Sequence, residues 1–373
     1  MFPPARSVIL ACVFAAALGA PVSAADFATT DAVAEARAAL QKIYDKRLDL
    51  RQFFGSDGQV VPAKKASGLL TLEEWARRYG YKEHPRELAA YAPPDVEDEL
   101  VPTALLPVPG AVIPTRKKGA AYNWRYQSAP IAIVLDAASR QVLLERRADE
   151  VKPIASLTKL MTAEVAVGQA PSWDGITYIK NSDEVGGARL RLQNGIPLTY
   201  RDVFYSMMVG SANNAANAIA RLTGLAREDF VAQMNARVRA AGLSRTRFTD
   251  PTGIDPANVS TAREAAALLI GALDQYEIRK AASTGFYDIQ LAEGKHVLKN
   301  TNQILTNDRN GLTVLGGKTG YLNDVGWNLA VKMEDARKRP LVVVVIGAGT
   351  NTKSFNDAIR LARWTWQNYQ WGK

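Results

Sequence analysis

The order of strand-like and helix-like segments constrains the fold of this chain more than any other feature of the sequence. Apolar runs typical of strands occur at 131–136, 141–147, 313–319, 327–333 and 341–346. Between the second and third runs the pattern is mostly helical to about residue 273, including 214–222 and 227–241, and a last helical pattern covers 354–369. Strands, a helical insertion, further strands and a final helix predict an α/β sandwich joined to an all-helical lobe.

Two of these segments also predict how the core is built. The run 341–346 is apolar without interruption, which is typical of a strand buried on both faces. The final helix carries Trp364 and Trp366, which a membrane anchor could also contain. Arg360 and Arg363 fit a solvated side of that helix, so we expect the tryptophans to pack against the sheet.

The first residues have the features of a secretory signal peptide, predicted at 1–24. Arg6 precedes an apolar run at 8–18, and small residues at 22–24 mark a cleavage point. A membrane anchor is the alternative, but the apolar run is short for a bilayer. The single cysteine, Cys12, lies in this segment, so the mature chain has no thiol for a disulfide, a nucleophile or a metal site. The protein is therefore expected to be exported, either periplasmic or associated with the cell wall.

The rest of the chain divides into three predicted parts. Residues 25–92 are expected to form a small helical appendage with a packing or spacer role, a polymer-binding module being the alternative. Residues 93–122 are predicted to form an extended linker, because each proline removes a backbone donor and disfavours helical structure in the residue before it. Its prolines are Pro93, Pro94, Pro102, Pro107, Pro109 and Pro114. Residues 123–373 are expected to form the domain that carries the chemistry.

Charge and histidine content exclude several classes of function. The net charge is +9, but the basic residues are scattered and are not interleaved with aromatics, so nucleic acid is a poor candidate partner. His84 and His296 are the two histidines, and neither lies near another ligand or triad partner in the sequence. Both are expected to be solvated loop or helix residues. A Ser-His-Asp hydrolase and a zinc site are disfavoured, and no metal or cofactor is predicted.

The first motif that carries chemistry is Ser156-x-x-Lys159. We expect a helix to begin at Ser156, which places residues three apart on one face and Lys159 within reach of the hydroxyl. The helix N-terminus, burial and a second cation would lower the lysine pKa, as a lysine base requires. The alternative is an ordinary N-cap serine followed by a solvated lysine.

The second motif is Ser211-x-Asn213, which follows an apolar helical pattern ending at Gly210. We expect both side chains in a loop between helices, where the hydroxyl relays a proton and the amide binds a carbonyl. An N-cap serine is the alternative. The same pattern recurs at 354–356, which shows how little it means alone.

The third motif is Lys318-Thr319-Gly320, after a strand-like run that contains Gly316 and Gly317. Glycines allow a second backbone to approach closely, and a strand at a sheet edge can pair with an extended peptide. The lysine and the threonine offer a cation and a hydroxyl to a carboxylate. A plain hairpin turn is the alternative.

In this order and context, the three motifs resemble those of the serine D-alanyl-D-alanine peptidases, the low-molecular-mass penicillin-binding proteins. The resemblance covers roughly residues 126–373 and implies a β-lactamase/transpeptidase-like fold, an antiparallel sheet sandwiched by helices. It also includes the stretches 250–253, 258–262 and 300–302. It implies peptidoglycan stem peptides as substrates and β-lactams as covalent inhibitors.

The resemblance also assigns roles to residues. Ser156 is expected to attack the carbonyl between two D-alanines, with Lys159 as general base. Ser211 is expected to pass a proton to the leaving amine, and Asn213 to orient the peptide. The third motif would bind the terminal carboxylate through Lys318 and Thr319, with Gly320 beside them. The backbone N–H groups of Ser156 and Tyr321 would form the oxyanion hole.

Two departures from the carboxypeptidase pattern bring the chain nearer the endopeptidase-like subgroup. Tyr321 stands where carboxypeptidases often carry histidine, and the sequence ends just after its last helix. A class A-like β-lactamase remains an alternative, but it needs a glutamate to activate water, and none occurs between Glu228 and Glu264. A protein that binds β-lactams or wall fragments without catalysis is the second alternative.

Overall fold

The computed structural model describes residues 102–307 and 311–372, which lie in one compact unit. The predicted signal peptide 1–24 with Cys12, and the predicted appendage 25–92 with His84, lie outside the described residues.

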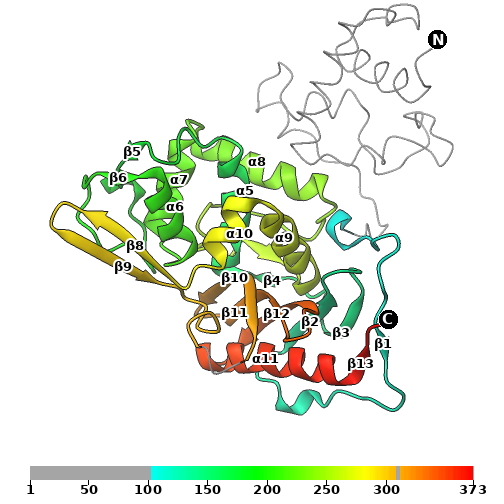
Figure 1. Cartoon of the computed structure of the whole chain (residues 1–373). Helices are drawn as coiled ribbons and strands as arrows, with labels where there is room; N and C mark the ends of the chain where they lie inside the picture. Colours follow the sequence, from blue (N-terminus) through cyan, green and yellow to red (C-terminus); the bar gives the residue numbers. More distant parts are fainter. Residues whose placement is uncertain (1–101, 308–310, 373) are drawn as a thin grey trace, which may run out of the picture. The chain divides into compact units, whose positions relative to one another are not determined.

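The centre of this unit is an antiparallel five-stranded sheet (Figure 1). Its strands, in spatial order, are β10 (Thr313–Leu322), β11 (Gly326–Glu334), β12 (Pro340–Ala348), β2 (Ile131–Asp136) and β3 (Val142–Arg146). Each of the five strand predictions is confirmed to within a few residues. The first strand in this order, β10, lies at the edge of the sheet and carries the third motif.

The strand β12 is buried on both faces, as its uninterrupted apolar run predicts. Val342, Val344 and Ile346 belong to one hydrophobic core, and the alternating residues Leu341 and Val343 belong to the other. Successive side chains of a strand point to opposite faces, so one strand supplies both cores.

Helices cover both faces of the sheet (Figure 1). On one face, α11 (Asn351–Asn368) packs on β11 and β12, with Trp366 buried and with Arg360 and Arg363 exposed, as predicted. On the other face, α9 (Ala262–Asp274) contacts β2, β11 and β12. None of the helices in the described ranges has the length and apolar character needed to cross a membrane.

The segment between β3 and β10 forms the helical lobe and a hairpin. The helices of the lobe, besides α9, are α5 (Lys159–Val167), α6 (Tyr200–Met208), α7 (Asn213–Leu222), α8 (Arg227–Ala240) and α10 (Tyr276–Ala282). The hairpin consists of β8 (Phe286–Leu291) and β9 (Gly294–Lys299), and it projects from the lobe in Figure 1. His296 lies half-buried on β9, so its placement in a loop or helix was wrong.

Short elements complete the unit. They are the 3-10 turns η3 (Thr103–Leu105), η4 (Trp124–Tyr126), η5 (Ala155–Thr158) and η6 (Asn181–Asp183), and the paired strands β1 (Thr115–Arg116) with β13 (Tyr369–Gln370), β4 (Lys152–Pro153) with β7 (Val259–Ser260), and β5 (Ile176–Thr177) with β6 (Leu198–Thr199). The described part of the predicted linker, 102–122, thus contacts the same unit: Thr103 N donates to Ala241 O, and β1 pairs with the C-terminal β13. The predicted division into domains stays a prediction.

Candidate active site

Ser156 lies in the 3-10 turn η5, which runs directly into α5 at Lys159, so a helical segment begins within one residue of the predicted start, with a first turn that is 3-10. In a 3-10 turn, residues three apart are eclipsed, which brings the two side chains even closer. The turn is held in an unusual conformation, with Ala155 at φ 52°. Gly253 packs so closely on it that a Cβ there would overlap the carbonyl oxygen of Ala155. Only glycine allows this approach.

The Lys159 side-chain amine is fully buried beside the Ser156 hydroxyl. Lys159 Nζ lies 2.9 Å from Ser156 Oγ and donates to Asn213 Oδ1 at 2.7 Å and to the carbonyl oxygen of Thr252 at 2.5 Å. Burial lowers the pKa of Lys159 well below its ordinary value, and the positive charge of Lys318 lowers it further. Asp250 acts in the opposite direction but does not outweigh them.

The Thr252 carbonyl is held in place by a network centred on Asp250. The Asp250 carboxylate accepts hydrogen bonds from the backbone of Thr252, Gly253 and Asp255 and from Asn258 Nδ2. Burial raises the pKa of Asp250, but the hydrogen bonds from Thr252, Asp255 and Gly253 outweigh it and keep the pKa below its usual value. The network therefore fixes one of the three oxygens that surround Lys159 Nζ.

The second motif lies opposite Ser156. Ser211 has φ 57° and receives a hydrogen bond from Lys318 Nζ at 2.6 Å. It is not an N-cap, because Ala212 is the N-cap residue of α7. Asn213 is the first residue of α7, not a loop residue as predicted, and its Nδ2 donates to the carbonyl oxygen of Gly186 at 2.6 Å. Both ends of the Asn213 amide are thus fixed, one by Lys159 and one by the loop at 186–188.

The third motif lies on the edge strand β10, against the turn η5. Lys318 is fully buried, and burial lowers its pKa to about 7. Thr319 Oγ1 donates to Thr301 Oγ1 at 2.7 Å. A Cβ at Gly320 would lie 2.8 Å from Ile154 O and 3.1 Å from Ser156 N, so only a glycine lets the strand approach the nucleophile this closely.

Tyr321 follows at the rim of the cleft. Its side chain is exposed, its hydroxyl donates to Asn323 Oδ1 at 2.8 Å, and its ring packs on Trp327 with 4.4 Å between ring centroids. The backbone of Tyr321 pairs with Trp327 across β10 and β11, one residue after the glycine that contacts the Ser156 amide.

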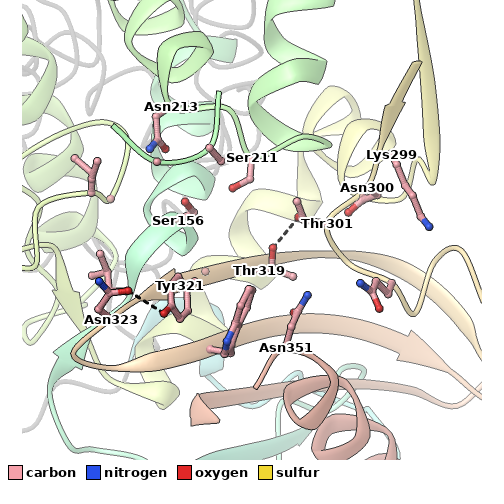
Figure 2. Close-up of a pocket in the computed structure, with 18 residues that line it drawn as sticks. Ser156, Ser211, Asn213, Lys299, Asn300, Thr301, Thr319, Tyr321, Asn323 and Asn351 are labelled. Carbon is pink, nitrogen blue, oxygen red and sulfur yellow. Dashed lines mark hydrogen bonds between the residues drawn. The ribbon is translucent and has the colours of Figure 1, made fainter. Parts of the chain in front are cut away.

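The three motifs meet in one cleft of about 620 Å³ (Figure 2). Figure 2 shows Ser156 at its centre, with Ser211 and Asn213 on one side and Thr319 and Tyr321 on the other. The buried amines of Lys159 and Lys318 lie behind this surface and contact its serines. The second Ser-x-Asn pattern lies in α11, and neither Ser354 nor Asn356 lines the cleft; Ser354 Oγ donates to the carbonyl oxygen of Asn351, which does.

The sequence did not assign roles to several other residues of the cleft. The stretches 250–253 and 300–302 stood out only as part of the resemblance, yet they supply the Thr252 carbonyl and the Thr301 hydroxyl. Gly187 and Ala188 also line the cleft. The two adjacent glycines at 186–187 are the sequence feature that could have indicated this loop as part of the site. Within the described ranges, no group of three His, Cys, Asp or Glu residues could hold a metal ion.

Comparison with known proteins agrees with this geometry. The family model described as D-alanyl-D-alanine carboxypeptidase matches residues 119–350. A D-alanyl-D-alanine endopeptidase of Pseudomonas aeruginosa is 32% identical over 237 residues, which are 62% of this chain and 76% of that protein. A D-alanyl-D-alanine carboxypeptidase of Escherichia coli is 32% identical over 255 residues, 64% of this chain and 61% of that protein. The crystal structure of the Streptomyces K15 DD-transpeptidase has a TM-score of 0.59 at 22% identity, covering 65% of this chain and 98% of that one, and confirms the predicted fold.

Proposed function

The chain belongs to the family of D-alanyl-D-alanine carboxypeptidases, and we propose that it cleaves peptidoglycan stem peptides through an acyl-enzyme on Ser156. It is a serine D,D-peptidase, a hydrolase. The predicted family and enzyme class are confirmed. The residue roles, the bond cleaved and the location are the subject of the proposal.

The hydrogen bonds of Lys159 carry the proposal. A neutral amine has two N–H donors and one lone pair, and both partners other than Ser156 are oxygens that only accept, Asn213 Oδ1 and Thr252 O. Those two oxygens therefore use both N–H groups, which leaves the lone pair for the Ser156 hydroxyl at 2.9 Å. Together with the lowered pKa, this arrangement favours an amine that takes the serine proton.

The reaction then proceeds in two halves. The proton of Ser156 moves to Lys159 as Oγ attacks the carbonyl carbon between two D-alanines, and the N–H groups of Ser156 and Tyr321 stabilise the oxyanion. The C–N bond breaks as Ser211 relays the proton held by Lys159 to the leaving amine, which restores the neutral lysine. Water then attacks the ester carbonyl while Lys159 takes a proton from it, the bond between the acyl carbon and Ser156 Oγ breaks, and Lys159 returns the proton to Oγ.

Substrate binding falls to the remaining motif residues. Lys318 and Thr319 bind the carboxylate on the leaving side, and Gly320 keeps the strand edge open to the peptide backbone. Asn213 holds the peptide with the amide that also fixes Lys159. A carboxylate beside Lys318 would raise the pKa of this lysine above about 7 and hold it charged.

Replacing Ser156 with alanine tests the mechanism. Ser156→Ala is expected to abolish both release of D-alanine or cross-link cleavage and labelling by a fluorescent penicillin, because the variant lacks the attacking oxygen. Ser244→Ala, at an exposed position outside the cleft, is the control and should keep both the hydrolysis and the labelling. Undiminished hydrolysis by Ser156→Ala rules out the mechanism.

We infer that the enzyme prefers cross-links over terminal D-alanine. Tyr321 in place of histidine and the similarity to an endopeptidase support this inference. Digestion of purified cross-linked wall fragments, followed by mass analysis, distinguishes the two bonds, since loss of a cross-link and loss of alanine give different masses. Release of alanine with cross-links intact would show that the preference is wrong.

β-Lactams are expected to acylate Ser156, and the resulting acyl-enzyme is expected to be hydrolysed slowly. No described residue that lines the cleft is a carboxylate, so the chain offers no glutamate there to activate water, which disfavours the β-lactamase alternative. A fluorescent penicillin bound to the protein should persist for longer than the assay. Rapid loss of the label with continued hydrolysis contradicts this expectation.

Export to the periplasm or cell wall also remains a proposal, supported by the signal-like segment 1–24. Amino-terminal sequencing of the protein purified from cells tests it. The mature protein should begin at residue 25 or 26, whereas an intact Met1 in the cytosolic fraction contradicts export.

A further inference from the structure

Lys299 is the charged side chain of the cleft surface. Among the described residues that line the cleft, no other side chain carries a full charge, and none is acidic. Lys299 is exposed at the end of β9 and has neither an ion pair nor a hydrogen bond from its ammonium group within the described part of the chain. A cation placed in an otherwise neutral cleft attracts an anionic group of whatever binds there.

The backbone at Lys299 is fixed on both sides. Leu298 is buried against the lobe, and Asn300 N donates to Gly285 O at 2.8 Å while its Nδ2 donates to Thr284 O at 2.7 Å. Thr301 N donates to Val209 O at 3.1 Å. The base of the hairpin is therefore tied to α6 and α10, and only the side chain of Lys299 is free to move.

The position of Lys299 relative to the third motif defines which part of the substrate it meets. Thr301 Oγ1 is bonded to Thr319 Oγ1, and Lys299 precedes Thr301 by two residues, about 7 Å along an extended chain. In Figure 2, Lys299 lies beyond Thr301 as seen from Ser156, whereas Tyr321 lies at the opposite end. A substrate whose carboxylate sits at Thr319 thus extends its leaving side toward Lys299.

The two possible leaving groups differ in their charge. A terminal D-alanine carries one carboxylate, which Lys318 and Thr319 would bind. The leaving half of a cross-link is itself a peptide, which ends in a further carboxylate. We propose that Lys299 binds a carboxylate on the leaving half of a cross-linked stem peptide and so favours cross-link cleavage over removal of terminal D-alanine. This inference rests on the proposed function, whose cross-link preference it explains.

Three substrates and two variants test the proposal in the full-length protein. The substrates are a cross-linked dimer of stem peptides, the same dimer with the carboxylates of its leaving half amidated except the one next to the scissile bond, and a monomer that ends in D-Ala-D-Ala. The variants are Lys299→Gln and Lys299→Glu. The matched control is Lys295→Gln, on the same strand but outside the cleft and paired with Asp288.

Lys299→Gln should lower kcat/KM for the dimer about three- to tenfold relative to the monomer, mainly through KM, since solvated ion pairs contribute modestly. Lys299→Glu should lower this ratio further, because it adds repulsion. Wild-type enzyme should have a higher kcat/KM for the free dimer than for the amidated dimer. Added salt should reduce this difference in kcat/KM, because it screens the attraction between Lys299 and the carboxylate. Lys295→Gln should keep the wild-type ratio.

Each contrary result has a distinct meaning. If wild-type enzyme cleaves the dimer, but neither Lys299 substitution nor amidation alters the ratio, the role of Lys299 is wrong and the proposed function stands. If the Lys299 variants lose activity equally on all three substrates, the residue supports the fold of the cleft, and the inference is again wrong. If wild-type enzyme releases alanine from the monomer but does not cleave the dimer, the cross-link preference and the role of Lys299 both fall.

Discussion

Two serine–lysine pairs lie in the same cleft, and the chain assembles them in different ways. Ser156 and Lys159 are three residues apart and meet within one turn of the backbone. Ser211 and Lys318 are 107 residues apart, and they meet because the edge strand β10 lies against the helical lobe. The first pair depends on local geometry, and the second depends on the whole fold.

The surroundings of the two lysines differ as well. Burial lowers the pKa of both, but the charge of Lys318 lowers the pKa of Lys159 further, and no such effect of a neighbour accompanies the pKa of about 7 at Lys318. Lys159 is enclosed by oxygens that use its N–H groups, whereas Lys318 lies behind the surface where a substrate carboxylate would bind. The difference indicates a base in the first pair and a carboxylate-binding cation in the second.

The largest effect is expected from removing the base. Lys159→Met should slow acylation of Ser156 by about 10²–10⁴-fold, the usual contribution of a general base. Stopped-flow labelling with a fluorescent penicillin measures the rate. Lys353→Met, on the exposed side of α11, is the control and should label at the wild-type rate. Normal acylation by Lys159→Met would mean that another group takes the proton.

A smaller but more diagnostic effect is expected at the second pair. Lys318→Met should slow acylation by about 10- to 100-fold through loss of a charged hydrogen bond. It should also raise the pKa of Lys159, because the repulsion from Lys318 disappears. The acid limb of the pH–rate profile should therefore move to higher pH, and Lys318→Arg, which keeps the charge, should move it less. An unmoved acid limb in Lys318→Met would show that the two pairs are not coupled.

The sequence predicted the first pair better than the second for a physical reason. Spacing along a turn fixes the distance from Ser156 to Lys159, so the contact could be derived from the motif even though the turn is 3-10 and not α. No local pattern relates Ser211 to Lys318. Their proximity followed only from a resemblance, and the strand order that produces it is a property of the fold.

Other parts of the site had still weaker signals. The Thr252 oxygen is a backbone atom, and any residue type supplies one, so its role could not be derived from the sequence. The close approach at Gly253 and Gly320 is visible only once the packing partner is known. The five strands of the sheet were predicted because their apolar runs follow from burial, whereas the β8–β9 hairpin is largely exposed, its apolar residues are interrupted by polar ones, and it was not predicted.

Gly320→Ala tests the contact that brings the pairs together. A Cβ would lie 2.8 Å from Ile154 O and 3.0 Å from Ala155 Cβ, so β10 would have to move away from η5. We expect roughly a tenfold loss of acylation and a destabilisation of about 1–3 kcal/mol, as overpacking commonly causes. Gly372→Ala is the control for added volume, because the nearest atom to its Cβ would be Val112 Cγ1 at 3.5 Å, an ordinary contact, and its φ is not in the left-handed region. Full activity in Gly320→Ala would show that the strand need not approach the nucleophile so closely.

The smallest effect concerns stability and follows from the lowered pKa of Lys318. Its pKa is about 7 in the folded protein and about 10.5 in an unfolded chain, so between these values the unfolded chain binds more protons and stability rises with pH. Below pH 7 both states are protonated, and the cost of burying the charge is greatest. The Lys318→Met variant does not have this cost at any pH. The difference in free energy of unfolding between variant and wild type should therefore fall by roughly 2 kcal/mol between pH 7 and pH 9, as the wild-type protein becomes more stable. Urea unfolding at each pH measures the difference. A constant difference would mean that Lys318 stays charged in the folded protein throughout this range, so that burial does not lower its pKa.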